Sequence, residues 1–169
     1  MEDAEFIVGL RTDPLRARFL HVTSPSIDDQ RAWTERYFQR EGDWYFVVED
    51  LEGNAQGCVA IYNHNARSRR SEWGRWILRD GSLAALESAA LVYEIGFARL
   101  GLESMYTHTE SANLPVISFH TSMGSTTNGL VTGPEGEDWT EQEMTNSKWT
   151  ELRNDIHSRV RMAARFATR

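Results

Sequence analysis

The residues with the clearest chemical potential lie in a short loop between a predicted strand and a predicted helix. Residues 79–84 read Arg-Asp-Gly-Ser-Leu-Ala, and an apolar helical pattern follows them. Free backbone N–H groups and the positive end of the helix dipole meet at such a loop and favour a phosphate group. Gly81, Ser82 and Ala84 are small enough to let phosphate oxygens approach the backbone. The loop is a candidate pyrophosphate site, and an ordinary capped loop is the alternative.

The histidines and the single cysteine do not form a metal-binding pattern. His21, His64 and His157 show no ligand spacing with one another or with carboxylates. The single cysteine, Cys58, excludes an internal disulfide and a zinc site built on several thiolates. It lies within a predicted strand, away from a helix start, so we expect a core residue rather than a nucleophile. No metal is predicted.

An apolar period of three to four residues predicts the helices that position the loop. In the central helix, Ser82 can cap the start and Gly101 the end. In the first helical region, Ser24-Pro25-Ser26 marks the start of a second helix. The segments expected to be helical are 13–38, 81–101, 113–123 and 151–166.

Runs of aromatic and β-branched residues between turn signals predict the strands. These runs cover residues 44–50, 56–62, 72–78, 104–109, 126–131 and 143–149. The chain order is helices, then a hairpin, then a strand-helix-strand unit of the length that a parallel crossover requires. This order predicts an α+β fold with a mixed sheet. In the third strand, Trp73 and Trp76 are expected on opposite faces, so that one of them could line a binding site. The alternative, more common for tryptophan, is that both are core residues.

Composition predicts one domain over residues 1–169, since the chain is 40% apolar and 25% charged. The net charge of −7 disfavours general electrostatic binding of nucleic acid. No run reaches the roughly 18 apolar residues of a membrane helix, so no membrane partner is expected. The N-terminus is acidic where a secretory signal would be basic, and one cysteine fits a reducing compartment, so we expect a cytoplasmic protein.

The candidate phosphate loop resembles a signature of the GNAT superfamily of acyl-CoA-dependent N-acyltransferases. Arg79-x-x-Ser82-x-Ala84 is similar to Gln/Arg-x-x-Gly-x-Gly/Ala, with serine at the middle glycine. The run 71–78, Ser-Glu-Trp-Gly-Arg-Trp-Ile-Leu, and the helix ending at 97–102, Phe-Ala-Arg-Leu-Gly-Leu, resemble one branch more specifically. That branch contains the acetyltransferases of ribosomal-protein N-termini and of small molecules such as amino sugars.

A second family motif follows in order and at the right spacing. Asn113-x-x-Val116-x-x-x-His120-x-x-x-Gly124 resembles the family's Asn-x-x-Ala-x-x-x-Tyr-x-x-x-Gly-Phe. Asn113 and Gly124 are in register, whereas His120 replaces the tyrosine and Ser125 the phenylalanine.

The resemblance implies a GNAT-type mixed, mostly antiparallel sheet, flanked by helices and splayed between its fourth and fifth strands. Acetyl-CoA would lie in that gap. Family members usually begin with a strand, for which only residues 5–11 are available here. The residues implied to bind the cosubstrate are Ile77, Leu78, Arg79, Asp80, Gly81, Ser82, Leu83, Ala84 and Asn113.

The implied chemistry is direct attack of an amine on the thioester, without a metal or a covalent enzyme intermediate. Glu72 is the candidate base, and His120, with an ordinary imidazole pKa near 6.5, is the candidate acid for the departing thiolate. Backbone N–H groups near Ile77 and Leu78 could polarise the carbonyl. The alternatives are a Glu72 paired with a nearby arginine and a packed or solvated His120. His108 is a weaker base candidate.

The acceptor is the least constrained part of the interpretation. A small amine such as an amino sugar is favoured, with Arg70 or Arg75 available for a nucleotide-sugar phosphate. A protein N-terminus or lysine is an alternative acceptor, and a non-catalytic acyl-CoA-binding module is an alternative function. The arginine-rich C-terminal helix could form a homodimer surface. We interpret the acidic residues 135–143 as a solvated connection, with a border to a cationic acceptor as the alternative.

Overall fold

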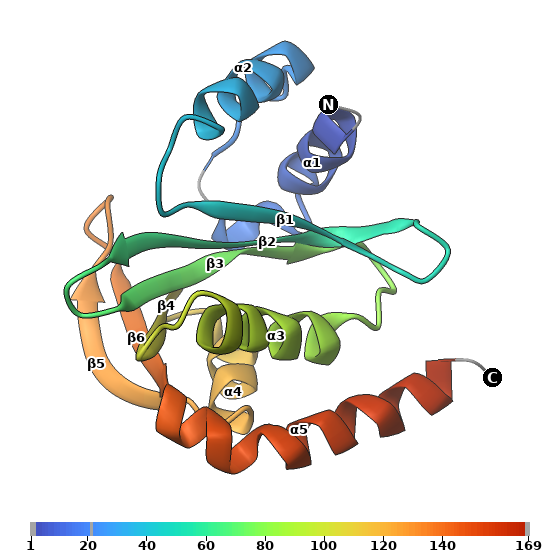
Figure 1. Cartoon of the computed structure of the whole chain (residues 1–169). Helices are drawn as coiled ribbons and strands as arrows, with labels where there is room; N and C mark the ends of the chain where they lie inside the picture. The colour runs from blue at the N-terminus through green and yellow to red at the C-terminus, as the bar shows by residue number, and fades with distance from the viewer. Residues whose placement is uncertain (1–2, 21, 168–169) are drawn as a thin grey trace.

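A six-stranded sheet lies between two layers of helices in the computed structural model, which describes residues 3–20 and 22–167 (Figure 1). The strands run in the order β1-β2-β3-β4-β6-β5, and the neighbours are antiparallel except β3 and β4. The strands are β1 (Trp44–Glu49), β2 (Ala55–Asn65), β3 (Arg70–Leu78), β4 (Ser104–Glu110), β5 (Thr126–Thr132) and β6 (Asp138–Thr145). The α+β class with a mixed, mostly antiparallel sheet is confirmed.

The helices divide between the two faces of the sheet. Helices α1 and α2 cover one face, and α3, α4 and α5 cover the other (Figure 1). Within the described residues, no helix is both long and apolar enough to cross a membrane. The helical elements are α1 (Asp3–Thr12), η1 (Ala17–Phe19), α2 (Ile27–Tyr37), α3 (Ala85–Glu94), η2 (Ile95–Arg99), α4 (Leu114–Ser122) and α5 (Asn146–Ala167).

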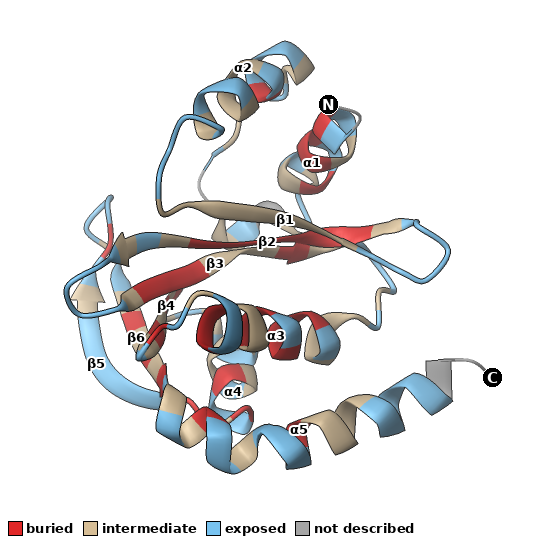
Figure 2. Cartoon of the chain, viewed as in Figure 1, coloured by how far each residue is buried: buried red, intermediate tan, exposed pale blue. Residues whose placement is uncertain are grey.

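The main core lies between the sheet and α3 and α5, as the buried residues in Figure 2 show. Tyr93 of α3 stacks on Phe97 and packs against Trp149 of α5. Gly96 allows the helix to approach β4, because a Cβ atom there would overlap Met105. Fully burying one such large side chain contributes about 1.5–3 kcal/mol. This packing fixes the position of α3, whose N-terminus follows the candidate phosphate loop.

The sheet opens between β3 and β4, which pair over only a few residues. Their parallel ladder joins Arg70 to Ser104 and ends where Glu72 faces Tyr106. Beyond that point β3 continues to Leu78 and β4 to Glu110 on separate paths. The expected splay is therefore present, between the third and fourth strands of this chain. It shifts by one in the count because the segment available for a first strand forms α1.

A bulge in β3 changes which side chains share a face. Ala60 of β2 faces Gly74 and Cys58 faces Ile77, so β3 holds one more residue than β2 there, and Arg75 has φ of +48°. Trp73 and Trp76 consequently lie together on the core side, with ring centroids 5.8 Å apart. The expected alternation of the two tryptophans is wrong, because an inserted residue shifts the two-residue period.

The N-terminal elements differ from the expectation. Residues 13–16 form no helix, and among the described residues the short helix η1 is the helical element between them and α2. The segment before them forms α1. Leu15 is 89% exposed, while Ile7 and Leu10 are buried against Cys58 and Ile77 of the sheet. Burial therefore selects the earlier segment. The second helix is confirmed as α2, with Ser26 as N-cap accepting from the Asp29 N–H.

Two boundaries at the central and C-terminal elements also differ. The last strand is β6 rather than 143–149, and α5 begins at Asn146, because Trp149 packs in the core at helical spacing with Leu152 and Ile156. At α3 the N-cap position is Ala84, whose side chain forms no cap, whereas Ser82 Oγ accepts from the Ala84 N–H at 3.3 Å, so Ser82 satisfies one backbone donor just before the helix. Gly101 does follow the helical segment, with φ of +65°.

Candidate active site

Two adjoining cavities flank the opening between β3 and β4. The larger, of about 890 Å³, lies between α2, the sheet and the β5–β6 turn. The smaller, of about 160 Å³, lies in the opening itself and is lined by Trp73, Trp76 and His120. His108 and Arg75 line both cavities. A molecule in one cavity would therefore lie next to a molecule in the other.

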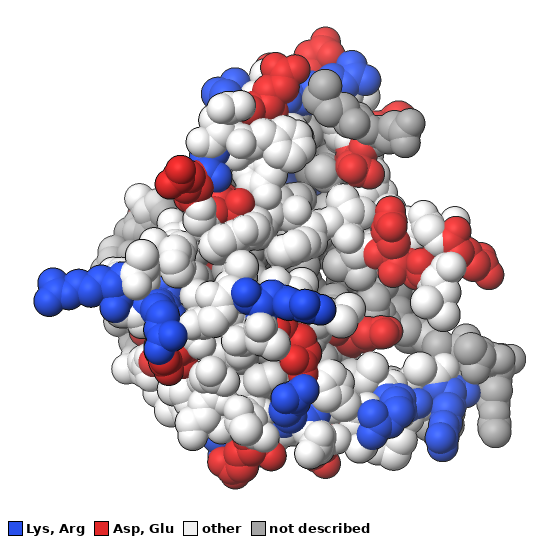
Figure 3. Space-filling model, viewed as in Figure 1, with Lys and Arg blue, Asp and Glu red and all other residues white. Residues whose placement is uncertain are grey.

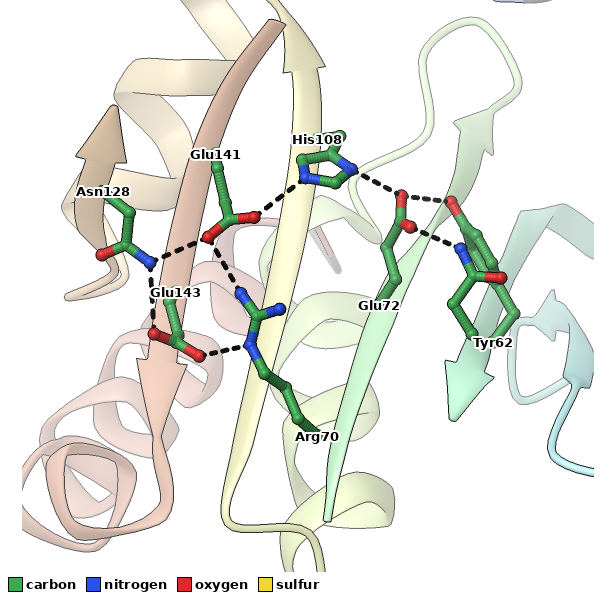
Figure 4. A network of polar contacts seen from close by, with 8 residues as sticks. Tyr62, Arg70, Glu72, His108, Asn128, Glu141 and Glu143 are labelled. Carbon is green, nitrogen blue, oxygen red and sulfur yellow. Dashed lines mark hydrogen bonds and ion pairs between the residues drawn. The ribbon is translucent and has the colours of Figure 1, made fainter. Parts of the chain in front are cut away.

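Glu72 is a buried carboxylate on the wall of the larger cavity. Its side chain is 7% exposed and accepts hydrogen bonds from Tyr62 Oη at 2.9 Å and Asn63 Nδ2 at 2.8 Å (Figure 4). Burial, and next the charge of Glu72, raise the pKa of Tyr62, so its hydroxyl stays a donor. Gly74 admits this arrangement, because a Cβ atom there would lie 2.8 Å from Tyr62 Oη. Glu72 pairs with none of the arginines that the sequence offered as alternatives, since its partners are neutral donors and a histidine.

His108 lies between two carboxylates. Its Nδ1 is 3.6 Å from Glu72 Oε1, and its Nε2 is 3.0 Å from Glu141 Oε2 (Figure 4). Tyr106, two residues earlier on β4, also lines the larger cavity. The face of β4 that carries Tyr106 and His108 is therefore the one that meets Glu72.

Arg70 and Asn128 hold Glu141 and Glu143 from two sides. Arg70 Nη2 lies 2.9 Å from Glu141, Arg70 Nε lies 2.8 Å from Glu143, and the Asn128 amide donates to both (Figure 4). Partial burial by itself would raise the pKa of Glu141, but hydrogen bonds from Asn128 and His108 and the charge of Arg70 outweigh it and lower that pKa. These two carboxylates belong to a strand beside the site, so the interpretation of 135–143 as only a solvated connection is wrong for them.

His120 lines the smaller cavity and is 3% exposed. Its ring meets the Trp73 ring edge to face, with centroids 5.0 Å apart. Burial lowers the pKa of His120 to about 4, so the charged imidazolium is scarce near neutral pH. Its Nδ1 is buried without a hydrogen-bond partner among the residues that the structure describes.

The candidate phosphate loop follows β3 directly and ends at the start of α3. Gly81 has φ of +70° and open space around it, and Leu83 is 70% exposed. The first N–H groups of a helix have no acceptor within the helix, and Ala84 offers them no side-chain cap. The loop therefore presents backbone donors on an accessible surface, which suits a phosphate group.

Neighbouring residues hold both ends of this loop. The Arg79 N–H donates to the Gln56 carbonyl at 2.8 Å, and Arg79 Nε donates to the Gln56 side chain at 3.0 Å. Arg16 donates to the Leu78 carbonyl at 3.2 Å and pairs with Asp80. Because these side chains are engaged with the protein, the backbone is the main donor that the loop offers to a ligand.

The remaining candidates fall at separate places. Asn113 lines the smaller cavity at the start of α4, where its side chain does not cap the helix. Ile77 is buried and faces Cys58 across the β2–β3 ladder. Burial raises the pKa of Cys58 to about 11, so its thiol stays protonated in the core, as expected. Among the described residues, no group of three or more potential ligands could hold a metal ion.

Sequence reasoning missed the partners of Glu72 and His108. Tyr62 and Asn63 lie at the end of β2, and Tyr62 faces Glu72 in the ladder. Glu141 faces His108 across the β4–β6 ladder. The signal was the alternation of Trp139, Glu141 and Glu143, which the misplaced last strand divided.

The charges on the face drawn in Figure 3 are interspersed, with basic and acidic side chains side by side rather than in one continuous field. The larger cavity has a different balance. It is lined by Arg11, Arg36 and Arg75 against the carboxylates of Asp29 and Glu72. Arg75 is already paired with Asp43, at 2.7 Å.

Comparison with known proteins identifies a family that this chain matches. A model described as an acetyltransferase (GNAT) domain matches residues 1–126. The solved structure of apo FdhC, described as a nucleotide-linked sugar GNAT, is 29% identical with a TM-score of 0.78, covering 92% of this chain and 88% of that chain. Spermidine N-acetyltransferase from Vibrio cholerae, solved with CoA and spermine, is 20% identical with a TM-score of 0.78, covering 88% and 93%. Comparison with curated protein sequences finds no significant match.

Proposed function

This chain belongs to the GNAT family of acetyltransferases, and from this membership we propose that it moves the acetyl group of acetyl-CoA to the primary amine of a nucleotide-linked amino sugar. One observation carries the proposal. Glu72 and His108 line a large cavity that carries several charged side chains and adjoins a smaller cavity walled by tryptophans in the splayed sheet. An amine in the larger cavity would meet a buried base and a thioester at the same place.

On the donor side, the loop and the start of α3 suit the pyrophosphate of acetyl-CoA. The loop of residues 79–84 would bind it through the backbone N–H groups of Asp80, Gly81 and Leu83 and of the first turn of α3, because the N–H groups at 79, 82 and 84 already donate within the protein. The acyl end would enter the smaller cavity, past Ile77 and Leu78 of β3 and opposite Asn113. The bulge in β3 takes backbone groups out of the regular ladder, and such groups could polarise the thioester carbonyl.

On the acceptor side, Glu72 is the proposed base. The attacking amine must lose a proton as its C–N bond forms and the C–S bond breaks. Glu72 is a buried carboxylate fixed by Tyr62 and Asn63, and it can accept a further hydrogen bond from the amine. His108 Nδ1 faces the same carboxylate oxygen and supports the same step.

His120 is proposed to act on the leaving sulfur as a neutral hydrogen-bond donor. Its place in the smaller cavity beside Trp73 and Trp76 fits the thiol end of CoA. Because its pKa is lowered to about 4 by burial, a neutral N–H rather than an imidazolium would meet the thiolate. The proton that the sulfur finally takes can then come from solvent as CoA leaves.

The larger cavity favours an anionic carrier on the acceptor. Its volume of about 890 Å³ is near the upper end of the roughly 300–1,000 Å³ of small-molecule sites and exceeds what one sugar needs. Arg11 and Arg36 could meet a diphosphate, and Trp33 offers an aromatic face to a base. Because Arg75 is paired with Asp43, Arg11 and Arg36 stand against the two carboxylates of the lining. The cavity therefore lacks the excess of negative charge that would favour a polyamine, which is a cation.

The test is release of the CoA thiol with a panel of amines. We expect turnover with nucleotide-linked amino sugars, weaker turnover with the free amino sugars, and none with spermidine or with peptides that present an N-terminus or lysine. Preference for a peptide or polyamine would overturn the acceptor assignment. Binding of acetyl-CoA without turnover of any amine would instead identify a non-catalytic acyl-CoA-binding module.

A further inference from the structure

The hydrogen bond between His108 and Glu141 determines which ring nitrogen carries the proton. A carboxylate accepts hydrogen bonds and, when ionised, donates none. Glu141 Oε2 lies 3.0 Å from His108 Nε2, so in the neutral ring the proton is on Nε2. The lone pair is then on Nδ1, which faces Glu72 Oε1 at 3.6 Å. Two acceptors therefore face each other across a gap too long for a hydrogen bond.

This gap is suited to a group that donates to both sides. An ammonium group has three donors, and it can point one at His108 Nδ1 and another at Glu72. Both residues line the larger cavity, and His108 also lines the smaller one. The amine of the acceptor would thus be held at the point where the two cavities adjoin.

Glu141 is itself held firmly. It faces His108 directly across the β4–β6 ladder, and Arg70 and Asn128 bind its other oxygen (Figure 4). The guanidinium of Arg70, on β3, also lies 3.8 Å from the centre of the Tyr106 ring, on β4. These contacts leave the Glu141 carboxylate with little freedom, so it can fix the ring that it binds.

We propose that Glu141 is a positioning residue, which acts through His108 by holding the proton on Nε2 and thereby presenting Nδ1 to the acceptor amine beside Glu72. The inference rests on the proposed function for its role in turnover. The bound ammonium loses one proton to His108 Nδ1, which gives the neutral amine, and Glu72 takes the second proton as the C–N bond forms and the C–S bond breaks. The carboxylate of Glu141 stabilises the imidazolium formed in the first transfer. No covalent bond to the enzyme is formed.

Glu141→Gln and Glu143→Gln form a matched pair. Both carboxylates lie on β6, bind Arg70 and Asn128, and lose one charge on substitution. Of these two carboxylates, Glu141 contacts His108 and Glu143 does not. In Glu141→Gln, Glu72 becomes the only carboxylate beside the ring, so the proton should move from Nε2 to Nδ1 and block the acceptor position. Glu141→Asp keeps the charge and should keep the proton on Nε2.

The ring tautomer can be measured by 15N NMR of the apo protein, with the ring neutral and the signal assigned by its loss in His108→Gln. We expect Nε2–H to dominate in the wild type, in Glu143→Gln and in Glu141→Asp, and Nδ1–H to dominate in Glu141→Gln. An unchanged tautomer in Glu141→Gln, or the same change in Glu143→Gln, would overturn the proposal. The Asp variant decides the result should Glu141→Gln fail to fold, because loss of the Nε2–H form there would also overturn it.

Kinetics supply the second readout. We expect kcat/KM for the acceptor to fall by about 10- to 100-fold in Glu141→Gln, because a protonated Nδ1 can neither accept a hydrogen bond from the amine nor take its proton, while KM for acetyl-CoA should stay within about twofold. Glu143→Gln should stay near the wild type. An equal loss in both variants would overturn the positioning role. A wild type that acetylates no amine overturns the proposed function alone, because the tautomer is measured without substrate.

Discussion

The two cavities that adjoin at His108 differ in size and in chemistry. The smaller is walled by tryptophans and a buried neutral histidine, and it is set by the path of two strands. The larger has more than five times the volume, about 890 Å³ against about 160 Å³, carries more charged side chains, and is formed in part by α2 and the β5–β6 turn. An acyl thioester needs a narrow, mostly apolar channel, whereas a polar acceptor needs room and charge. The smaller cavity, formed by the sheet, therefore suits the acyl thioester of the donor, and the larger cavity, formed in part by peripheral elements, suits the acceptor.

The largest expected effect comes from the residue between the two cavities. Glu72→Gln removes the proposed base, so we expect kcat to fall about 10²- to 10⁴-fold. Glu72 lines only the larger cavity, so the affinity for acetyl-CoA should stay within about twofold. Steady-state kinetics and calorimetry measure the two quantities, and an unchanged kcat would remove Glu72 from the mechanism.

The smaller cavity can be tested through the stability of its buried histidine. Burial lowers the pKa of His120 from 6.5 to about 4, so the unfolded chain binds a proton that the folded protein does not. This contribution is fully present above pH 6.5 and is lost as the pH falls towards 4, by about 3 kcal/mol in the free energy of unfolding.

His120→Phe keeps an aromatic ring between the tryptophans and removes the titrating group. We expect the stability of this variant to depend less on pH across the same window than that of the wild type. Urea unfolding at a series of pH values measures the difference. Parallel curves for the two proteins would show that folding does not lower the pKa of His120, and would contradict its proposed role as a neutral donor at the sulfur.

An acidic substitution at Ala84, at the end of the phosphate loop, should weaken acetyl-CoA binding without destabilising the apo protein. Ala84→Asp places a carboxylate at the start of α3, where the helix dipole should stabilise the apo protein by about 0.3–1 kcal/mol, while the same charge repels the pyrophosphate. We expect acetyl-CoA to bind about 10- to 100-fold more weakly, a loss of about 1.4–2.8 kcal/mol. Ala84→Asn has a side chain of the same size without the charge and is the control. Equal affinities for the Asp and Asn variants would place the pyrophosphate elsewhere.

The smallest expected effect concerns acceptor choice in the larger cavity. Arg36→Gln should raise KM by up to about tenfold for acceptors that carry a diphosphate and leave KM for the free amino sugar unchanged. Arg31→Gln, on the same helix but outside the cavity, should change neither. Equal effects on both acceptors would argue against an anionic carrier.

Local patterns predicted the elements that carry strong periodicity, and long-range contacts decided the rest. The helix from Ala85, the strand from Ser104 and the α+β class follow from apolar spacing and turn residues. Leu15 has the same spacing as a buried residue and is exposed, because only packing against the sheet selects α1 over its neighbour. The local sequence pattern does not indicate which of the two segments packs against the sheet.

The candidate site was predictable only in part for related reasons. Glu72 could be predicted because the family resemblance places its strand beside the acceptor cleft. The place of His108 depended on which face of β4 meets the opening, which the β4–β6 ladder decides. The bulge at Arg75, which brings Trp73 and Trp76 to one face, depends on a backbone conformation that periodicity does not encode.

Transfer of a labelled acetyl group tests the central claim most directly. The purified protein is incubated with acetyl-labelled acetyl-CoA, with and without a nucleotide-linked amino sugar, and the label is followed on protein and acceptor. Direct attack beside Glu72 predicts label on the acceptor amine only when both substrates are present, and none on the protein. Label on the protein, or binding of acetyl-CoA with no transfer to any amine, would contradict the account.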